Sequence, residues 1–513
     1  MALKELDIYE DIMLNHPAEA QGASISMYRM ALEAWRRGIE VRFMTVYVKD
    51  RIKIRHKLAY GGREYRFQLS LGDKVAKEAR QIGKSKEMTK QHLAAAGVSV
   101  PEGKVITVQN NNFREALEYA ETIGYPVIIK PAHASLAIGV HTNLNDERAL
   151  SEALDHVHGR LGYEDIIIER HAPGFDTRAY VIEDEVIAAF KRVPAHIEGD
   201  GEHNIRQLIE MKNQRRKLNP HLGGSELKVD DRMTDYIGNQ GYRLDSILGK
   251  GEKINLTDST FAKDASDTVD ITDDITEDYR MTAVNAVKSI PGMNMGGVDI
   301  IRDEETDTNN VLEINCRPDL GGHMFPIYGK SRDVAKRIVD YYFPETAAVD
   351  TGVKQYLTFD FDEIFRFLKK GIVKEVILPP LPKSEIENVH LEMSGNINHY
   401  RHAISNAAAG HRLGGNMKML GENRAKMVVA GTVKHLTSFL EELIKIAPRL
   451  NIKVTARNEW DSLLTYKFEM PGNTGLQSLS RLRKESIEMR NEITALKKEI
   501  DELKKTRSIK VDK

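Results

Sequence analysis

The hydrophobic and polar positions of the chain alternate between a period near two, which predicts strands, and a period near 3.6, which predicts helices. The helical pattern is clear at Ala23–Gly38, where Met27, Ala31 and Trp35 fall on one stripe. Strands and helices follow in mixed order, which favours an α+β architecture over a doubly wound sheet. The polar stretch Met211–Asp274 has no clear assignment. Strands are predicted at Glu40–Val48, within Ile52–Leu71, and at Tyr125–Pro131, Asp165–Glu169, Thr177–Ile182 and Glu185–Arg192, and helices at Lys84–Ala96, Ala116–Gly124, Asp146–Leu161 and Asp278–Ile290.

Two further strand patterns carry oxygen-bearing side chains, which a strand core would normally exclude. Residues 297–301 include Asp299, and residues 311–318 include Glu313 and Asn315. Because Glu313 and Asn315 are two apart, they project to the same face of a strand, and Asp299 joins them if the two segments pair as a hairpin. Two carboxylates and one amide oxygen suit Mg2+, which takes a few carboxylates and completes its shell with phosphate oxygens. An ordinary solvated hairpin is the alternative.

Several charged residues stand at strand ends, where a phosphate compound could bind. Lys130 closes an apolar strand and precedes a loop of small residues, 132–139, so backbone N–H groups and an ammonium could hold phosphate oxygens. A surface lysine that reaches for solvent is the alternative. Glu169 ends one strand, and Asp176 and Arg178 begin the next; they could hold adenine, ribose and phosphate respectively, or form a charged turn.

Composition limits the class of protein. At 513 residues the chain is too long for one core and predicts three or more units. A net charge of −2, without a basic block in the folded part, predicts no nucleic-acid partner. The sequence has neither an apolar run of about 18 residues nor a signal-peptide pattern. We therefore expect a cytoplasmic protein without a membrane partner. The single cysteine, Cys316, excludes a disulfide within the chain and a cysteine-cluster metal site.

The motifs of the middle of the chain, taken in order, resemble an ATP-grasp carboxylate–amine ligase. The resemblance is closest to the ATP-grasp part of cyanophycin synthetase and of the bifunctional glutathione synthetases, and it implies an ATP-grasp fold after an N-terminal α/β region. One departure is the loop 132–139, which has a single glycine where relatives often have two or more. The motifs lie at residues 85–90, 96–103, 127–131, 168–178, 192–194, 199–209, 270–274, 297–299, 313–318 and 329–344.

The resemblance implies a role for each candidate site residue, with ATP and Mg2+ as cofactors. The nucleotide would be contacted by four residues: Lys86 and Lys130 at the phosphates, Glu169 at the adenine hinge and Asp176 near the ribose. Mg2+ would be held by Asp299, Glu313 and Asn315. The transferred phosphoryl group or the acyl phosphate would face Arg178 and Arg192.

The implied reaction activates a carboxylate as an acyl phosphate and joins it to an amine, with an amino acid or short peptide as the small-molecule substrate. The sequence has no G-x-x-x-x-G-K-[ST] motif, so we expect neither the second ligase half of a cyanophycin synthetase nor the glutamate–cysteine ligase half of a bifunctional glutathione synthetase. We therefore expect one ATP site and one ligation. The alternative is a non-catalytic ATP-binding scaffold or switch, which has less need of every Mg2+ ligand.

The proline-rich segment Pro379–Pro382 marks a boundary, after which the predicted order of elements is β-α-β-β-α-β. That order fits a ferredoxin-like fold of about 90 residues, and the motifs at 394–401, 413–415 and 428–431 resemble acylphosphatase. Two departures predict a retained fold with lost activity: the loop Gly395–Arg401 is two residues shorter than in the family, and Met419 stands at the position of the catalytic asparagine. The alternative is hydrolysis of stray acyl phosphate. The predicted helices are His402–Ala409 and Leu436–Ile446.

The end of the chain has a heptad pattern on a background of Glu, Lys and Arg, which predicts a two-stranded coiled coil and hence a homo-oligomer, either a dimer or a dimer of dimers. A single amphipathic helix is the alternative. The predicted organisation is an N-terminal α/β region at 1–84, an ATP-grasp domain at 85–346, a linker at 347–384, an acylphosphatase-like domain at 385–470 and a coiled coil at 475–507. The seam consists of Leu479, Leu482, Ser486, Met489, Ile493, Leu496, Ile500 and Leu503.

Overall fold

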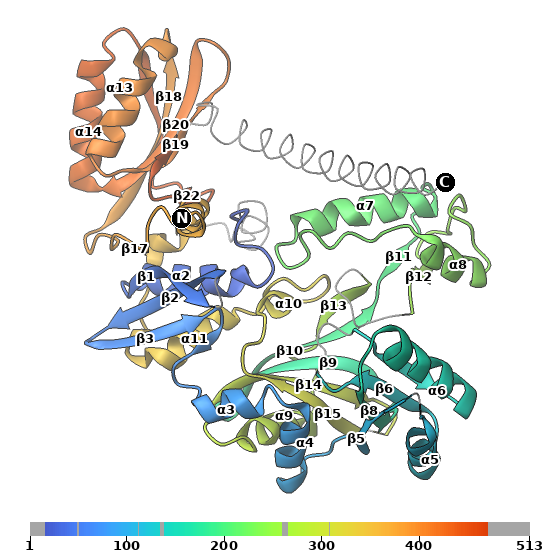
Figure 1. Cartoon of the computed structure of the whole chain (residues 1–513). Coiled ribbons are helices and arrows are strands. Elements are labelled where there is room, and N and C mark those ends of the chain that lie inside the picture. The colour runs from blue at the N-terminus through green and yellow to red at the C-terminus, as the bar shows by residue number, and fades with distance from the viewer. Residues whose placement is uncertain are drawn as a thin grey trace, which may run out of the picture. The chain divides into compact units, whose positions relative to one another are not determined.

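The computed structural model describes residues 16–48, 51–110, 112–133, 138–258, 265–306 and 308–469 (Figure 1). These residues form two compact units, and the chain passes between them three times. Residues 16–350 and 361–381 belong to the first unit, and residues 351–360 and 382–469 belong to the second. The predicted coiled coil at 475–507 lies outside the described residues.

The first part of the first unit is an antiparallel sheet with the strand order β17-β1-β2-β3-β4. The helix α2 (Ser24–Arg36) and the strand β1 (Glu40–Val48) confirm the sequence pattern, and the polar β-type segments become β2 (Arg51–Tyr60), β3 (Arg63–Gln68) and β4 (Leu71–Gly72).

The segment 347–384, predicted as a linker, contains ordered elements. The helix α12 (Phe361–Lys369) buries Phe361, Phe365 and Leu368, which recur at helical spacing. The strand β17 (Glu375–Ile377) then pairs with β1. The apolar stripe of α12 helps to make residues 361–381 part of the first unit.

A four-stranded antiparallel sheet, here named sheet B, forms the lobe that carries Lys130. Its order is β5-β8-β6-β7, with the strands Gly103–Thr107, Asp165–Arg170, Val127–Pro131 and His141–Leu144 respectively. The helices α5 (Arg114–Ile123) and α6 (Glu147–Leu154) share its hydrophobic core. The predicted helix Asp146–Leu161 is present, but its second half, Asp155–Arg160, is π-helical. Two short helices, α3 (Lys77–Ile82) and α4 (Lys86–Ala95), precede the lobe.

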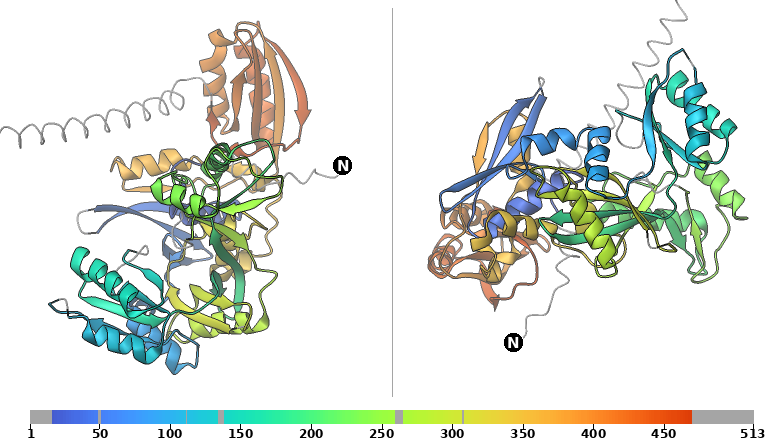
Figure 2. Two further views of the ribbon diagram at one scale, coloured as in Figure 1. Left: turned by 90° about the vertical axis from the view of Figure 1, so that its right-hand side faces the viewer. Right: turned by 90° about the horizontal axis from the view of Figure 1, so that it is seen from below.

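A five-stranded antiparallel sheet, here named sheet C, forms the centre of the unit. Its order is β13-β10-β9-β14-β15, and the helix α9 (Glu277–Lys288) packs against four of these strands (Figures 1 and 2). The helices α10 (Gly321–Met324) and α11 (Val334–Tyr342) follow the last strand. The strands are β13 (Ser266–Asp270), β10 (Glu185–Pro194), β9 (Phe175–Ile182), β14 (Met295–Asp303) and β15 (Thr308–Asn315).

The stretch Met211–Asp274, which sequence patterns leave unassigned, includes the second half of α7, the helix α8 and the strands β12 and β13. The helix α7 (Ile205–Leu218) is rich in charged residues, so its apolar stripe is faint, but its start carries a capping box between Asn204 and Gln207. The helix α8 (Asp231–Asn239) packs with it on a separate hydrophobic core. The strands β11 (His196–Glu198) and β12 (Lys253–Asn255) pair beside them.

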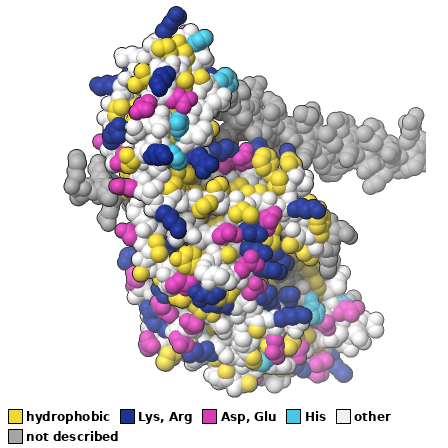
Figure 3. Space-filling model, turned by 90° about the vertical axis from the view of Figure 1, so that its left-hand side faces the viewer, with side chains coloured by type: hydrophobic (Ala, Val, Ile, Leu, Met, Phe, Trp, Pro, Cys, Tyr) yellow, Lys and Arg dark blue, Asp and Glu magenta, His cyan; other side chains and the backbone are white. Residues whose placement is uncertain are grey.

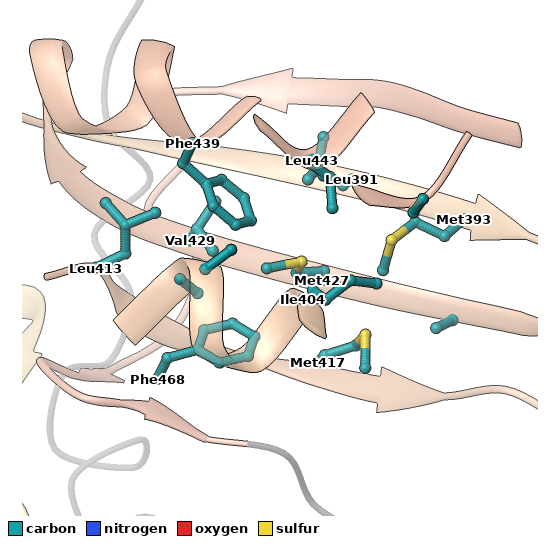
Figure 4. Close-up of a cluster of buried hydrophobic side chains, with 14 of the residues drawn as sticks. Leu391, Met393, Ile404, Leu413, Met417, Met427, Val429, Phe439, Leu443 and Phe468 are labelled. Atoms are coloured by element: carbon teal, nitrogen blue, oxygen red, sulfur yellow. The ribbon is translucent and has the colours of Figure 1, made fainter. Parts of the chain in front are cut away.

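The second unit has the predicted β-α-β-β-α-β order. Its sheet has the order β21-β18-β20-β19-β23, and the helices α13 (Ile397–Gly410) and α14 (Val433–Ile446) pack against each other and on the sheet (Figure 4). Apolar side chains from the strands and both helices fill the space between them. The strands are β18 (Ile386–Ser394), β19 (Gly414–Met419), β20 (Arg424–Thr432), β21 (Asn451–Arg457) and β23 (Phe468–Glu469).

Two details of the second unit differ from the sequence patterns. Helix α13 begins five residues before the predicted His402, because the side chain of Asn396 accepts a hydrogen bond from the N–H of His399 and caps the helix there. Arg401 therefore lies within a helix and not at the end of a loop. The short strand β16 (Leu357–Thr358), from the segment predicted as a linker, pairs in parallel with β22 (Leu464–Thr465).

The surface and the helices add two observations. On the face shown in Figure 3, Lys and Arg side chains are interspersed with Asp and Glu side chains. Among the described residues, no helix is both long enough and apolar enough to span a membrane. The cytoplasmic location stays a prediction.

Candidate nucleotide and magnesium site

The three predicted Mg2+ ligands meet on the β14–β15 hairpin. Asp299 and Glu313 are direct cross-strand partners, and Gly297 stands opposite Asn315, which confirms the predicted hairpin. The amide Nδ2 of Asn315 donates to Glu313 Oε1 at 2.9 Å and to Asp299 Oδ2 at 3.3 Å. The alternation of the strands thus brings two carboxylates and one amide together, as their spacing predicts.

Two arginines from neighbouring strands of sheet C contact the carboxylates. Arg178 on β9 stands opposite Asp299 and binds it through two hydrogen bonds, 2.5 Å from Nε and 2.6 Å from Nη2. Arg192 on β10 donates to Asp176 Oδ1 at 2.6 Å and lies 3.9 Å from Asp299 Oδ1. Asp176 and Asp299 are buried, so each depends on an arginine for compensation of its charge.

Burial and neighbouring charges move the pKa values of these carboxyl groups in different directions. Burial favours the neutral form of Asp299, but Arg178 and Arg192 outweigh burial and hold its pKa below the usual value. Burial and the charge of Asp299 raise the pKa of Glu313. Burial also raises the pKa of Asp176, although Arg192 opposes the shift. A divalent cation between Asp299 and Glu313 would favour the ionised form of both.

The donor set fits Mg2+. Among the described residues there is no group of three or more His, Cys, Asp or Glu side chains that could hold a metal. The hairpin offers two carboxylates and the amide of Asn315, whose oxygen could turn toward a cation because amide oxygen and nitrogen exchange places on rotation. Mg2+ commonly takes so few protein ligands when phosphate oxygens and water complete its shell.

The lysines of the predicted nucleotide site lie on sheet B and α4. Lys130 on β6 contacts Glu169 Oε2 at 2.6 Å, and Glu169 is buried on β8. Lys86 is the first residue of α4, which Ser85 caps by accepting a hydrogen bond from the N–H of Met88 at 3.2 Å. Burial lowers the pKa of Lys86, while the charges of Glu313 and Glu169 raise it and that of Lys130 lowers it. Lys86 therefore interacts electrostatically with Glu313 of the hairpin and with Lys130 and Glu169 of sheet B.

Sequence reasoning missed one residue of this group. Lys90 donates to Glu169 Oε1 at 3.2 Å and to the carbonyl of Gly103 at 3.2 Å. It stands one helical turn after Lys86, so the two ammonium groups leave the same side of α4. The spacing of four on a predicted helix is the signal that could have identified it.

The nine candidate residues thus form two groups. Asp176, Arg178, Arg192 and the three predicted Mg2+ ligands share sheet C, and Lys130 and Glu169 share sheet B, with Lys86 interacting with both. Their functional roles stay predictions. A cavity of about 930 Å³ between α7 and residues 224–229 contains none of them. Residues 134–137 of the predicted phosphate loop lie outside the described part of the chain.

The chain is similar to known proteins over part of its length. Residues 85–216 match the family model described as the ATP binding domain of the carbamoyl-phosphate synthase L chain. A cyanophycin synthetase of Crocosphaera subtropica is 34% identical over 301 residues, which is 56% of this chain and 33% of that protein. A glutathione biosynthesis bifunctional protein of Listeria innocua is 30% identical over 269 residues, which is 50% of this chain and 34% of that protein.

Among solved structures, a bifunctional glutathione synthetase from Pasteurella multocida is 24% identical, with a TM-score of 0.46 over 59% of this chain and 42% of that one. The chain spans about a third of the length of the curated relatives it matches. The matched relatives are those to which the motifs of the middle of the chain point. The chain carries an ATP-grasp domain homologous to those of cyanophycin synthetases and bifunctional glutathione synthetases.

Proposed function

We propose that the chain is an ATP- and Mg2+-dependent ligase that joins a carboxylate to an amine. The supporting observation is the meeting of Asp299, Glu313 and Asn315 on one hairpin, with Arg178 bound to Asp299. A carboxylate is a poor electrophile, and activation as an acyl phosphate makes it open to attack by an amine. The similarity to a cyanophycin synthetase and to glutathione biosynthesis bifunctional proteins supports an amino acid or short peptide as substrate.

The residues divide the work as follows. Lys86 and Lys130 would bind the nucleotide phosphates, with Glu169 at the adenine and Asp176 near the ribose. Mg2+ held by Asp299, Glu313 and Asn315 would neutralise phosphate oxygens. Arg178 and Arg192 would orient the acyl phosphate and stabilise its negative charge, since fixed cations in a partly buried site act without reorganisation.

An assay of ADP release tests the proposal. The full chain is supplied with ATP, Mg2+ and a panel of amino acids and dipeptides, and ADP and phosphate are measured. We expect ADP to form in equal amounts with an amide product, and only with a matched carboxylate and amine. Tight ATP binding without ADP release under every pair of substrates would instead support a non-catalytic nucleotide-binding scaffold.

The second unit is proposed to be a ferredoxin-like relative of acylphosphatase that lacks catalysis. Its element order and strand order support the fold. Met419, the last residue of β19, has no side-chain amide that could position a water molecule. We therefore predict that Arg401→Ala leaves the hydrolysis of benzoyl phosphate by the full chain unchanged, measured as phosphate release. A rate that falls with Arg401→Ala would show an active acylphosphatase site.

The heptad seam from Leu479 to Leu503 is proposed to make the protein a dimer or a dimer of dimers. Pairing removes large apolar side chains from water, at roughly 1.5–3 kcal/mol for each fully buried residue before ordering costs. We predict that deletion of the residues after Thr474 lowers the mass measured by light scattering and leaves ligation largely unchanged. An unchanged mass would mean that another surface holds the subunits together.

A further inference from the structure

Glu169 is shared between two lysines that come from different elements. Its Oε2 lies 2.6 Å from the ammonium of Lys130 on β6, and its Oε1 lies 3.2 Å from that of Lys90 on α4. The Glu169 side chain is 9% exposed, against 16% for Lys130 and 26% for Lys90. At this depth the three groups interact more strongly than exposed ion pairs do, because less water screens them.

Lys90 changes the net charge of the group that Lys130 and Glu169 form. An ion pair formed by Lys130 and Glu169 alone is neutral and would offer little attraction to a phosphate. With Lys90 on the second oxygen, two ammonium groups share one carboxylate, and the group carries a net positive charge. Lys86, one turn earlier on α4, adds a further cation.

Lys90 also has a second contact that fixes its position. Its ammonium donates to the carbonyl of Gly103 at 3.2 Å, and Gly103 on β5 stands directly opposite Glu169 on β8. No side chain fits at Gly103, because a Cβ there would lie 2.3 Å from the carbonyl oxygen of Ile168. The ammonium of Lys90 is thus held where the two strands meet.

We propose that Lys90 is a positioning residue for the nucleotide phosphates: by binding one oxygen of Glu169 it leaves Lys130 with uncompensated positive charge. This inference rests on the proposed nucleotide site. It predicts that the role of Lys90 depends on Glu169. If the carboxylate is removed, Lys130 has no counter-ion to share, and Lys90 becomes dispensable.

The test measures the affinity of the full chain for MgADP by calorimetry. Lys90→Met should weaken binding about tenfold, the equivalent of one charge-assisted hydrogen bond at the lower end of its range. Lys90→Arg should restore most of the affinity. Lys104→Met is the matched control, because Lys104 follows Gly103 on β5 and pairs with a glutamate, Glu115, at 3.0 Å on the surface. The control should bind MgADP as the wild type does.

A double-mutant cycle separates positioning from direct contact. In the Glu169→Gln background, we expect Lys90→Met to change MgADP affinity less than twofold. An equal loss in both backgrounds would overturn the inference in favour of direct phosphate binding by Lys90. A lower melting temperature with unchanged affinity would overturn it in favour of a purely structural tie. Failure of the wild type itself to bind MgADP would contradict the proposed function instead.

Discussion

Replacement of Glu313 by Gln is expected to reduce turnover by about a thousandfold or more, a loss typical when charge stabilisation is removed from a transition state. Glutamine keeps the shape of the side chain and can still accept the 2.9 Å hydrogen bond from Asn315. It cannot supply the negative charge that a divalent cation needs. The loss should therefore appear mainly in kcat for ADP release at saturating ATP, with a melting temperature close to that of the wild type.

A second glutamate of the same hairpin provides the control. Glu304 lies in the turn between β14 and β15, its side chain is 56% exposed, and it lies 3.8 Å from Lys191. Glu304→Gln should turn over ATP at the wild-type rate. Near-normal turnover by Glu313→Gln would show that the hairpin does not hold the catalytic metal.

Replacement of Arg178 by Met is expected to damage both stability and activity. The change leaves the buried carboxylate of Asp299 without its two short hydrogen bonds, and loss of one partner from a buried ion pair costs about 3–5 kcal/mol. In a chain of this size we expect a melting temperature lower by about 3–5 °C. Arg114→Met, which removes an exposed pair with Glu118, should leave the melting temperature unchanged.

The stability difference should depend on pH in a defined direction. In the wild type the pKa of Asp299 lies below its usual value, so the stabilisation from Arg178 is present above the unfolded pKa of about 3.9 and is lost below it. In Arg178→Met, burial raises the pKa of Asp299, and protonation relieves the unpaired charge as pH falls. The gap between wild type and variant should therefore be largest near pH 7 and shrink toward pH 4. A gap that is constant with pH would show that packing, and not charge, is responsible.

The hairpin site could be predicted because strands impose a simple rule on side chains. Residues two apart on a strand share a face, so Glu313 and Asn315 had to lie together, and pairing of the strands added Asp299. No comparable rule links distant elements. The hydrogen bonds from Arg178 to Asp299 and from Lys90 to Glu169 depend on which strands become neighbours, and local pattern does not determine this.

The errors in the prediction of the fold have physical reasons as well. Helix α7 was not predicted because charged and amide side chains together fill most of its positions and leave only a faint apolar stripe. The segment at 347–384 was predicted as a linker between two domains, although Phe361, Phe365 and Leu368 repeat at helical spacing and become buried. Helix α13 begins before the predicted residue because the side chain of Asn396 caps it there, and the apolar pattern does not reveal such a cap.

The threefold passage of the chain between its two units makes both units discontinuous in sequence. A fragment that ends at residue 384 keeps β16 but loses β22, its pairing partner, and a fragment that begins at residue 385 has β22 without β16. During synthesis, β16 leaves the ribosome more than 100 residues before β22, so the pairing of the two strands has to wait until Thr465 has been made. A cut between residues 384 and 385 thus yields two incomplete fragments. Experiments on either unit therefore need the intact chain or a circularly permuted one.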